Sequence, residues 1–172
     1  MSQFGWKFDH IGAAAMPSAD RAADPTGSTR ADVEAIVATT IAYTWAIDEH
    51  DWDRLRDVFD ADCVAQLGSE LSVGIDAIIA RISRTLGPLD CSQHLLGNHE
   101  VTVAGDEARS RCYFQAQHVR VGAPGGDQLL IAGRYVDEWR RTPKGWRIAR
   151  RDLISMWRSG NPAVVRPGPS TA

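Results

Sequence analysis

An aspartate and a histidine are the two residues of this sequence best suited to acid–base chemistry. Asp48 follows Ile41, Thr44 and Trp45 at helical spacing, so its carboxylate shares an apolar stripe. Burial without a cation raises the pKa of a carboxylate and makes it a stronger base. His94 opens a predicted strand, and an imidazole suits general acid or base catalysis near neutral pH. We predict Asp48 and His94 as catalytic residues; the alternatives are a helix-end cap for Asp48 and a histidine at a sheet margin.

A second histidine ends a row of small and apolar side chains. In the predicted strand 108–121, alternation places Cys112, Phe114, Ala116 and His118 on one face. We predict that Phe114 and His118 line a pocket wall. The alternative for His118 is a core histidine bonded to a carbonyl group.

Four further residues are predicted to contact a substrate. The Tyr43 hydroxyl could donate to a substrate oxygen, although a core tyrosine is an equal alternative. Trp45 lies on the stripe of Asp48, and Asn98 shares the face of His94 if the strand alternates regularly. Arg151, on the last predicted strand, could pair with a carboxylate or hold an anionic oxygen.

The elements that must position these residues are helices first and strands afterwards. The sequence predicts a helix from Ser28 or Thr29 to about residues 48–50, a short helix from Asp51, and a third helix over 74–86. A short strand is predicted at 63–67, and long strands at 93–103, 108–121, 129–141 and 145–157. This order predicts an α+β fold in which three N-terminal helices and a curved, mixed or antiparallel sheet enclose a pocket.

The domain prediction follows from composition. Residues 1–28 are rich in Ala, Asp, Pro, Gly and Ser and are predicted to be an N-terminal arm or tail. The domain is predicted to span 29–158, and 159–172 to form a C-terminal tail.

Composition excludes several classes of protein. The chain has 172 residues, is 44% hydrophobic and carries a formal net charge of -3, which indicates one domain and no nucleic-acid partner. The three cysteines form no C-x-x-C pair, so neither a disulfide framework nor a zinc ribbon is expected. No stretch has the length of a membrane span, and no signal peptide is evident, so we expect a cytoplasmic location. Nucleotide-binding and metalloprotease motifs are absent, and His94 and His99 are predicted on opposite strand faces, so we expect neither a metal nor a cofactor.

Several strings resemble one known family. The string AYTWAIDEHDWDRL (42–55), the pair Gln93–His94 and the strings GRYVDE (133–138) and GWRI (145–148) are similar to the nuclear-transport-factor-2-like superfamily. The likeness is greatest to the scytalone dehydratase and SnoaL-like group. It implies a cone-shaped α+β fold with a deep apolar pocket and an Asp–His dyad formed by Asp48 and His94. It also implies substrate-contacting roles for Tyr43, His118 and Arg151.

The resemblance implies a cofactor-independent lyase, of the dehydratase kind, acting on a cyclic, largely apolar carbonyl compound. An isomerase or a polyketide cyclase with the same base is an alternative. A non-catalytic ligand-binding protein, or a dioxygenase small subunit, is another. The expected partners are a small-molecule substrate and further copies of the chain, as a homo-oligomer that is a dimer or a trimer.

Overall fold

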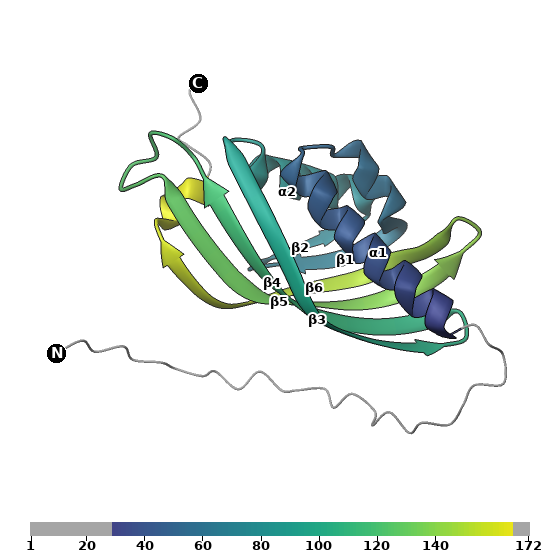
Figure 1. Ribbon diagram of the computed structural model, residues 1–172. Coiled ribbons are helices and arrows are strands. Elements are labelled where there is room, and N and C mark those ends of the chain that lie inside the picture. Colours follow the sequence, from purple (N-terminus) through teal and green to yellow (C-terminus); the bar gives the residue numbers. More distant parts are fainter. Residues whose placement is uncertain (1–28, 167–172) are drawn as a thin grey trace.

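The computed structural model describes residues 29–166, in which two α-helices precede most of a six-stranded sheet (Figure 1). The first part contains α1 (Thr29–Asp48), the 3₁₀ helix η1 (Asp53–Asp57), β1 (Phe59–Leu67), β2 (Glu70–Val73) and α2 (Ile75–Leu86). The second part contains β3 (Cys91–Ala104), β4 (Glu107–Val119), β5 (Gln128–Thr142), β6 (Gly145–Gly160) and the 3₁₀ helix η2 (Pro162–Val165). No helix in this part of the chain is long and apolar enough to cross a membrane.

The sheet is mixed, with the strand order β2-β1-β6-β5-β4-β3. Strand β1 runs parallel to β6, and all other neighbouring pairs are antiparallel. The sheet curves strongly, and both α-helices lie on its concave side (Figure 1). The prediction of an α+β fold with a curved sheet is therefore confirmed, and the sheet is of the mixed kind.

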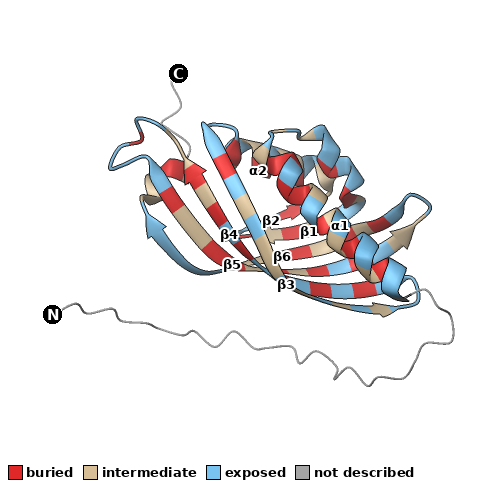
Figure 2. Cartoon of the chain, viewed as in Figure 1, coloured by how far each residue is buried: buried red, intermediate tan, exposed pale blue. Residues whose placement is uncertain are grey.

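Alternating burial along the strands places the core between the sheet and the helices. Along β4, every second residue from Ala108 to His118 is buried, and the intervening side chains face outward. Figure 2 shows this alternation as successive bands along β4 and β5. The predicted inward face of this strand, with Phe114 and His118, is confirmed.

An ionic and aromatic contact fixes α1 against the sheet. Asp32, in the first turn of the helix, accepts two hydrogen bonds from the Arg141 guanidinium at 2.7 and 2.9 Å. It also accepts one from the Trp146 indole N–H at 3.0 Å, and Arg141 lies over the Trp146 ring. Because α1 carries Tyr43 and Asp48 at its other end, this contact helps to set where those side chains lie.

Only two of the three predicted helices are α-helices. The segment predicted as a short helix from Asp51 forms η1, whose five residues make a single tight turn. Asp51 Oδ1 accepts the Arg54 backbone N–H, a local side-chain contact that favours a turn over a continued helix. Strand β2, a four-residue edge strand, was not predicted from the sequence.

The predicted terminal segments lie mostly outside the described residues. Residues 1–28 and 167–172 are not described. Within the segment predicted as a C-terminal tail, β6 continues to Gly160 and η2 follows it, with Val164 fully buried.

Candidate active site

Asp48 and His94 are in direct contact. Asp48 is the last residue of α1 and His94 lies on β3, and Asp48 Oδ1 is 2.6 Å from His94 Nδ1. The other carboxylate oxygen accepts the His94 backbone N–H at 2.8 Å, and the Ser92 hydroxyl donates to Oδ1 at 2.7 Å. Three hydrogen-bond donors on β3 therefore fix the position of the Asp48 carboxylate, and this carboxylate in turn orients the His94 imidazole.

These contacts correct one expectation about Asp48. Burial acts to raise its pKa, but the hydrogen bonds and charge of His94, together with the Ser92 hydrogen bond, bring the pKa below its ordinary value of 3.8. Asp48 is therefore ionised at neutral pH and is not the strengthened base that burial alone predicts. Since an ionised carboxylate can only accept, Nδ1 of His94 donates to it, and the neutral form of the ring then has its lone pair on Nε2.

The second histidine packs against the first. The rings of His94 and His118 are 5.5 Å apart between centroids in an edge-on arrangement. Burial, with a smaller contribution from the charge of His94, lowers the pKa of His118 to about 4. His118 is therefore neutral at physiological pH. Its Nδ1 is buried and has no hydrogen-bond partner within residues 29–166.

Both histidines line a cavity of about 360 Å³ between the helices and the concave face of the sheet. The cavity walls are mainly apolar, with side chains from α1, α2, β4, β5 and β6 that include Ile47, Ile82, Phe114, Ile131 and Leu153. The His94 side chain is only 5% exposed. With Nδ1 turned toward Asp48, Nε2 is the ring nitrogen available to a ligand in this cavity.

Two tyrosines form the part of the cavity wall beside a buried ion pair. The rings of Tyr43 and Tyr135 meet edge-on, with centroids 5.7 Å apart, and both residues line the cavity. The Arg151 guanidinium lies over both rings and donates two hydrogen bonds of 2.7 Å to Asp137. Burial raises the pKa of both tyrosines, so their hydroxyls stay protonated and can act as donors. Arg151 is completely buried and pairs with a carboxylate, one of its two predicted roles, without lining the cavity.

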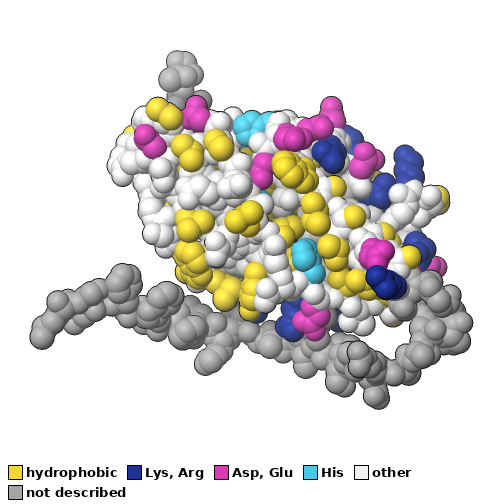
Figure 3. Space-filling model, viewed as in Figure 1, with side chains coloured by type: hydrophobic (Ala, Val, Ile, Leu, Met, Phe, Trp, Pro, Cys, Tyr) yellow, Lys and Arg dark blue, Asp and Glu magenta, His cyan; other side chains and the backbone are white. Residues whose placement is uncertain are grey.

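Two of the predicted substrate-contacting residues lie away from the cavity. Trp45 is 57% exposed on the outer side of α1, and Figure 3 shows apolar side chains on the surface of the face that includes this helix. Asn98 is exposed and has a φ of 55°, because β3 contains a bulge between Gly97 and Glu100. The extra residue reverses the alternation, so Asn98 turns away from the face of His94, and Val101 packs against the core instead of facing outward.

Three residues of the site were not predicted from the sequence: Ser92, Tyr135 and Asp137. Ser92 is two residues before His94, so strand alternation alone places it on the same face. Tyr135 and Asp137 alternate in the same way on β5, within the GRYVDE string. Among residues 29–166, no three His, Cys, Asp or Glu side chains are grouped as metal ligands.

Comparison with known proteins identifies the family. The family model described as a SnoaL-like domain matches residues 28–152. The chain belongs to this family. Uncharacterized proteins of Mycobacterium tuberculosis strain H37Rv and of Mycobacterium bovis are each 38% identical to it over 118 residues, which cover 64% of this chain and 76% of theirs.

Three solved structures of similar proteins superpose on the fold. A candidate aromatic ring hydroxylase from Novosphingobium aromaticivorans has a TM-score of 0.72 and 31% identity, covering 80% of this chain and 98% of its own. A candidate scytalone dehydratase from the same organism also has a TM-score of 0.72, with 19% identity, covering 84% of this chain and 97% of its own. A nuclear-transport-factor-2-like protein from Salmonella enterica has a TM-score of 0.67 and 19% identity, covering 84% and 99%. The last two likenesses show the fold alone, which is that of the nuclear-transport-factor-2-like superfamily.

Proposed function

We propose that this SnoaL-like protein is a cofactor-independent proton-transfer enzyme that acts as a dehydratase on a cyclic, largely apolar carbonyl compound. The observation that carries the proposal is the 2.6 Å contact between Asp48 Oδ1 and His94 Nδ1 at the wall of an apolar cavity. A base that is oriented by a carboxylate and faces an apolar cavity is an arrangement suited to proton abstraction from carbon.

In the proposed reaction, His94 Nε2 takes a proton from the carbon next to the substrate carbonyl. The electron pair of the broken C–H bond moves into an enolate, and Asp48 stabilises the imidazolium that forms. A neutral donor of the cavity, the Tyr43 hydroxyl or an N–H of His118, stabilises the enolate oxygen. The enolate then re-forms the carbonyl, and its electron pair makes a double bond between the α and β carbons. The hydroxyl group on the β carbon takes the proton that His94 carried and leaves as water.

The apolar walls support the choice of substrate class. A cavity of about 360 Å³ is within the range of small-molecule sites and has room for a bicyclic ring system. Phe114 stacks on Tyr135 with centroids 4.6 Å apart, which gives the cavity a flat aromatic wall. Low polarity around the base also strengthens its interaction with the carboxylate behind it.

The test uses 1-tetralone, a bicyclic ketone, in deuterated buffer. Mass spectrometry follows deuterium entry next to the carbonyl, with the uncatalysed rate subtracted. We expect the wild type to accelerate exchange and His94→Gln to reduce the acceleration by about 10²–10⁴-fold, the usual contribution of a positioned base. The matched control is His99→Gln, which makes the same substitution on the same strand outside the cavity lining; it should exchange like the wild type.

The proposal fails if the wild type does not accelerate exchange, or if His94→Gln exchanges as fast as His99→Gln. A second substrate, 3-hydroxy-1-tetralone, then separates the outcomes that share this base. Release of 1-naphthol supports the dehydratase, whereas exchange without release favours an isomerase or a cyclase.

One alternative from another class has a specific observation in its favour. The solved structure with 31% identity is that of a candidate aromatic ring hydroxylase. The small subunits of ring-hydroxylating dioxygenases share this fold and act as structural partners. A non-catalytic subunit does not need an oriented imidazole at a cavity wall. Absence of exchange, together with stable assembly with a larger iron–sulfur subunit, would favour this alternative.

A further inference from the structure

The cavity has a buried end and an exposed end of different character. His94, His118 and the two tyrosines lie at the buried end. The exposed end is formed by the β1–β2 turn, the second half of α2, β6 and η2, and it carries most of the hydroxyl and guanidinium groups of the lining: Ser69, Arg81, Thr85, Ser155 and Arg158.

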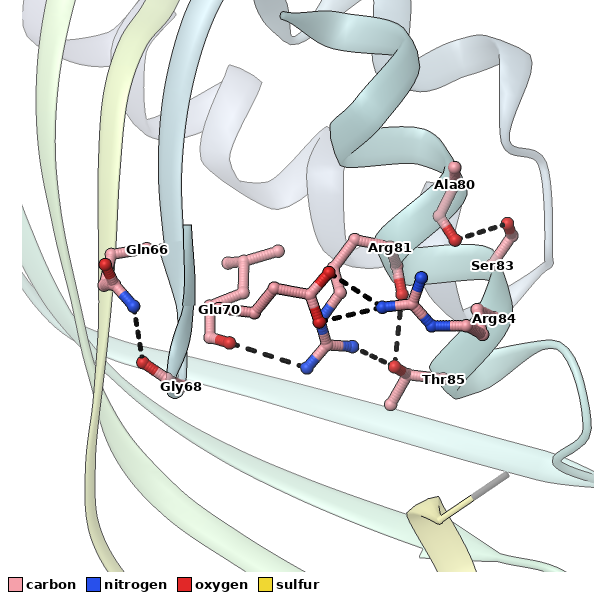
Figure 4. Close-up of polar contacts among 9 residues, drawn as sticks. Gln66, Gly68, Glu70, Ala80, Arg81, Ser83, Arg84 and Thr85 are labelled. Atoms are coloured by element: carbon pink, nitrogen blue, oxygen red, sulfur yellow. Dashed lines mark hydrogen bonds and ion pairs between the residues drawn. The ribbon is translucent and has the colours of Figure 1, made fainter. Parts of the chain in front are cut away.

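One of the two arginines at this end is held in place by protein groups. Arg81 forms an ion pair with Glu70, with Nε 2.8 Å from Oε2, and it donates to the Thr85 hydroxyl. Glu70 also accepts two hydrogen bonds of 2.8 Å from Arg84 (Figure 4). The charge of Arg81 is therefore partly offset by Glu70, which it shares with Arg84 and which does not line the cavity.

The other arginine has no such partner. Arg158 is exposed on β6, and its side chain makes no ion pair or hydrogen bond to any residue in the range 29–166. It contrasts with Arg150 and Arg151 of the same strand, which bind Asp152 and Asp137 respectively. Ser155, also on β6 and also in the lining, adds a hydroxyl group to the same end.

The charges of the residues that line the cavity also favour an anionic ligand. Two arginines and no Asp or Glu are among the residues that line it, although the whole chain has a formal net charge of -3. A guanidinium is a planar donor that matches a carboxylate in two hydrogen bonds. A neutral substrate would leave the Arg158 guanidinium at the cavity mouth without a partner.

We infer that the substrate is a carboxylic acid, whose carboxylate binds Arg158 at the exposed end while its ring system enters the apolar part of the cavity. The inference rests on the proposed function for the orientation of the substrate, and it narrows the substrate class to anionic ring compounds. Arg158 acts as a specificity-determining residue, because it places the ring with its carbonyl end toward His94. Ser155 supplies a hydroxyl donor at the same end of the cavity, whereas the Thr85 hydroxyl already donates to the Arg81 carbonyl oxygen.

Binding of 2-naphthoate and of its neutral isostere 2-naphthamide tests this inference on the full chain. Isothermal titration calorimetry at low salt should give a dissociation constant at least about fivefold lower for naphthoate, since a partly exposed charged hydrogen bond is worth that much. Arg158→Gln should remove this preference and leave naphthamide binding unchanged. The matched control is Arg109→Gln, an exposed arginine on the outer side of β4, which should keep the wild-type preference.

Equal binding of the two probes, an unchanged preference in Arg158→Gln, or failure of both probes to bind at millimolar concentration would overturn the inference. Added salt should weaken naphthoate binding alone. The measurement does not depend on catalysis, so His94→Gln should show the same naphthoate preference as the wild type. A failed exchange assay with a retained preference would therefore refute the proposed reaction and leave the carboxylate site standing.

Discussion

Replacing Asp48 by asparagine should change the tautomer of His94 while keeping every hydrogen bond around it. The backbone N–H of His94 can only donate, so it requires the amide oxygen of the new side chain. The amide nitrogen then faces His94 Nδ1 and the Ser92 hydroxyl, both of which can accept. Nδ1 becomes the acceptor, the imidazole proton moves to Nε2, and the lone pair that would take a substrate proton is lost.

The expected loss of activity is large and the expected loss of stability is small. A wrong tautomer in a carboxylate–histidine pair lowers the rate by about 10³–10⁴-fold. Because the hydrogen bonds are re-formed and only the charge is lost, the free energy of unfolding should fall by only about 1–2 kcal/mol. Deuterium exchange into 1-tetralone measures the first effect, and urea denaturation measures the second.

Nitrogen-15 NMR of the ring nitrogens of His94 tests the cause. In the wild type the proton should reside on Nδ1, and in Asp48→Asn on Nε2. Glu49→Gln is the matched control, because it makes the same change in the neighbouring, exposed carboxylate and should leave tautomer and rate unchanged. A folded Asp48→Asn variant with a rate within threefold of the wild type would refute the reasoning, whichever tautomer it contains.

Three further predictions concern stability. Because the pKa of Asp48 in the folded state lies below its ordinary value of 3.8, its carboxylate stabilises the fold above that pH, and the contribution is lost as pH falls through the lowered pKa. Urea denaturation should therefore show the wild type losing its stability advantage over Asp48→Asn as the pH is lowered below 3.8. Arg151→Met leaves the Asp137 carboxylate buried without its cation and should cost about 3–5 kcal/mol in chemical denaturation, whereas the double variant Arg151→Met/Asp137→Leu should recover a large part of that loss. Gly133→Ala would place a Cβ atom against the carbonyl oxygen of Ile154 on the neighbouring strand, so its melting temperature should fall by several degrees; an unchanged melting temperature would show that β5 and β6 can separate there.

Elements with a long, regular pattern were predictable from the sequence. The end of α1 at Asp48 was predicted, and the alternation of β4 placed Phe114 and His118 inside. The predicted apolar stripe of α1 was wrong in part, because Ile41 and Trp45 are exposed. The pairing of Asp48 with His94 was implied by the family resemblance, because periodicity along α1 and β3 does not by itself say which residues of the two elements meet. Helix α1 and strand β3 pack together, so their facing side chains meet.

Other errors in the predicted elements and site residues come from short elements and from a single extra residue in β3. Helix η1 and strand β2 have five and four residues, too few for periodicity to distinguish them from a loop. The bulge in β3 turned Asn98 outward, and a bulge of one residue leaves no mark in a regular alternating pattern. The pKa of Asp48 was predicted in the wrong direction because the donors around it come from β3, 44 and 46 residues away in the chain.

The most direct test of the central claim is a crystal structure with 1-naphthol, which resembles the enol form of 1-tetralone. We expect the ring to occupy the cavity, with the carbon next to the hydroxyl-bearing carbon about 3–3.5 Å from His94 Nε2. We also expect the ligand oxygen to accept or donate a hydrogen bond at Tyr43 or His118, while the contact between Asp48 and His94 Nδ1 stays intact. A ligand bound outside the cavity, or a His94 Nε2 closed off from a ligand within it, would contradict the account.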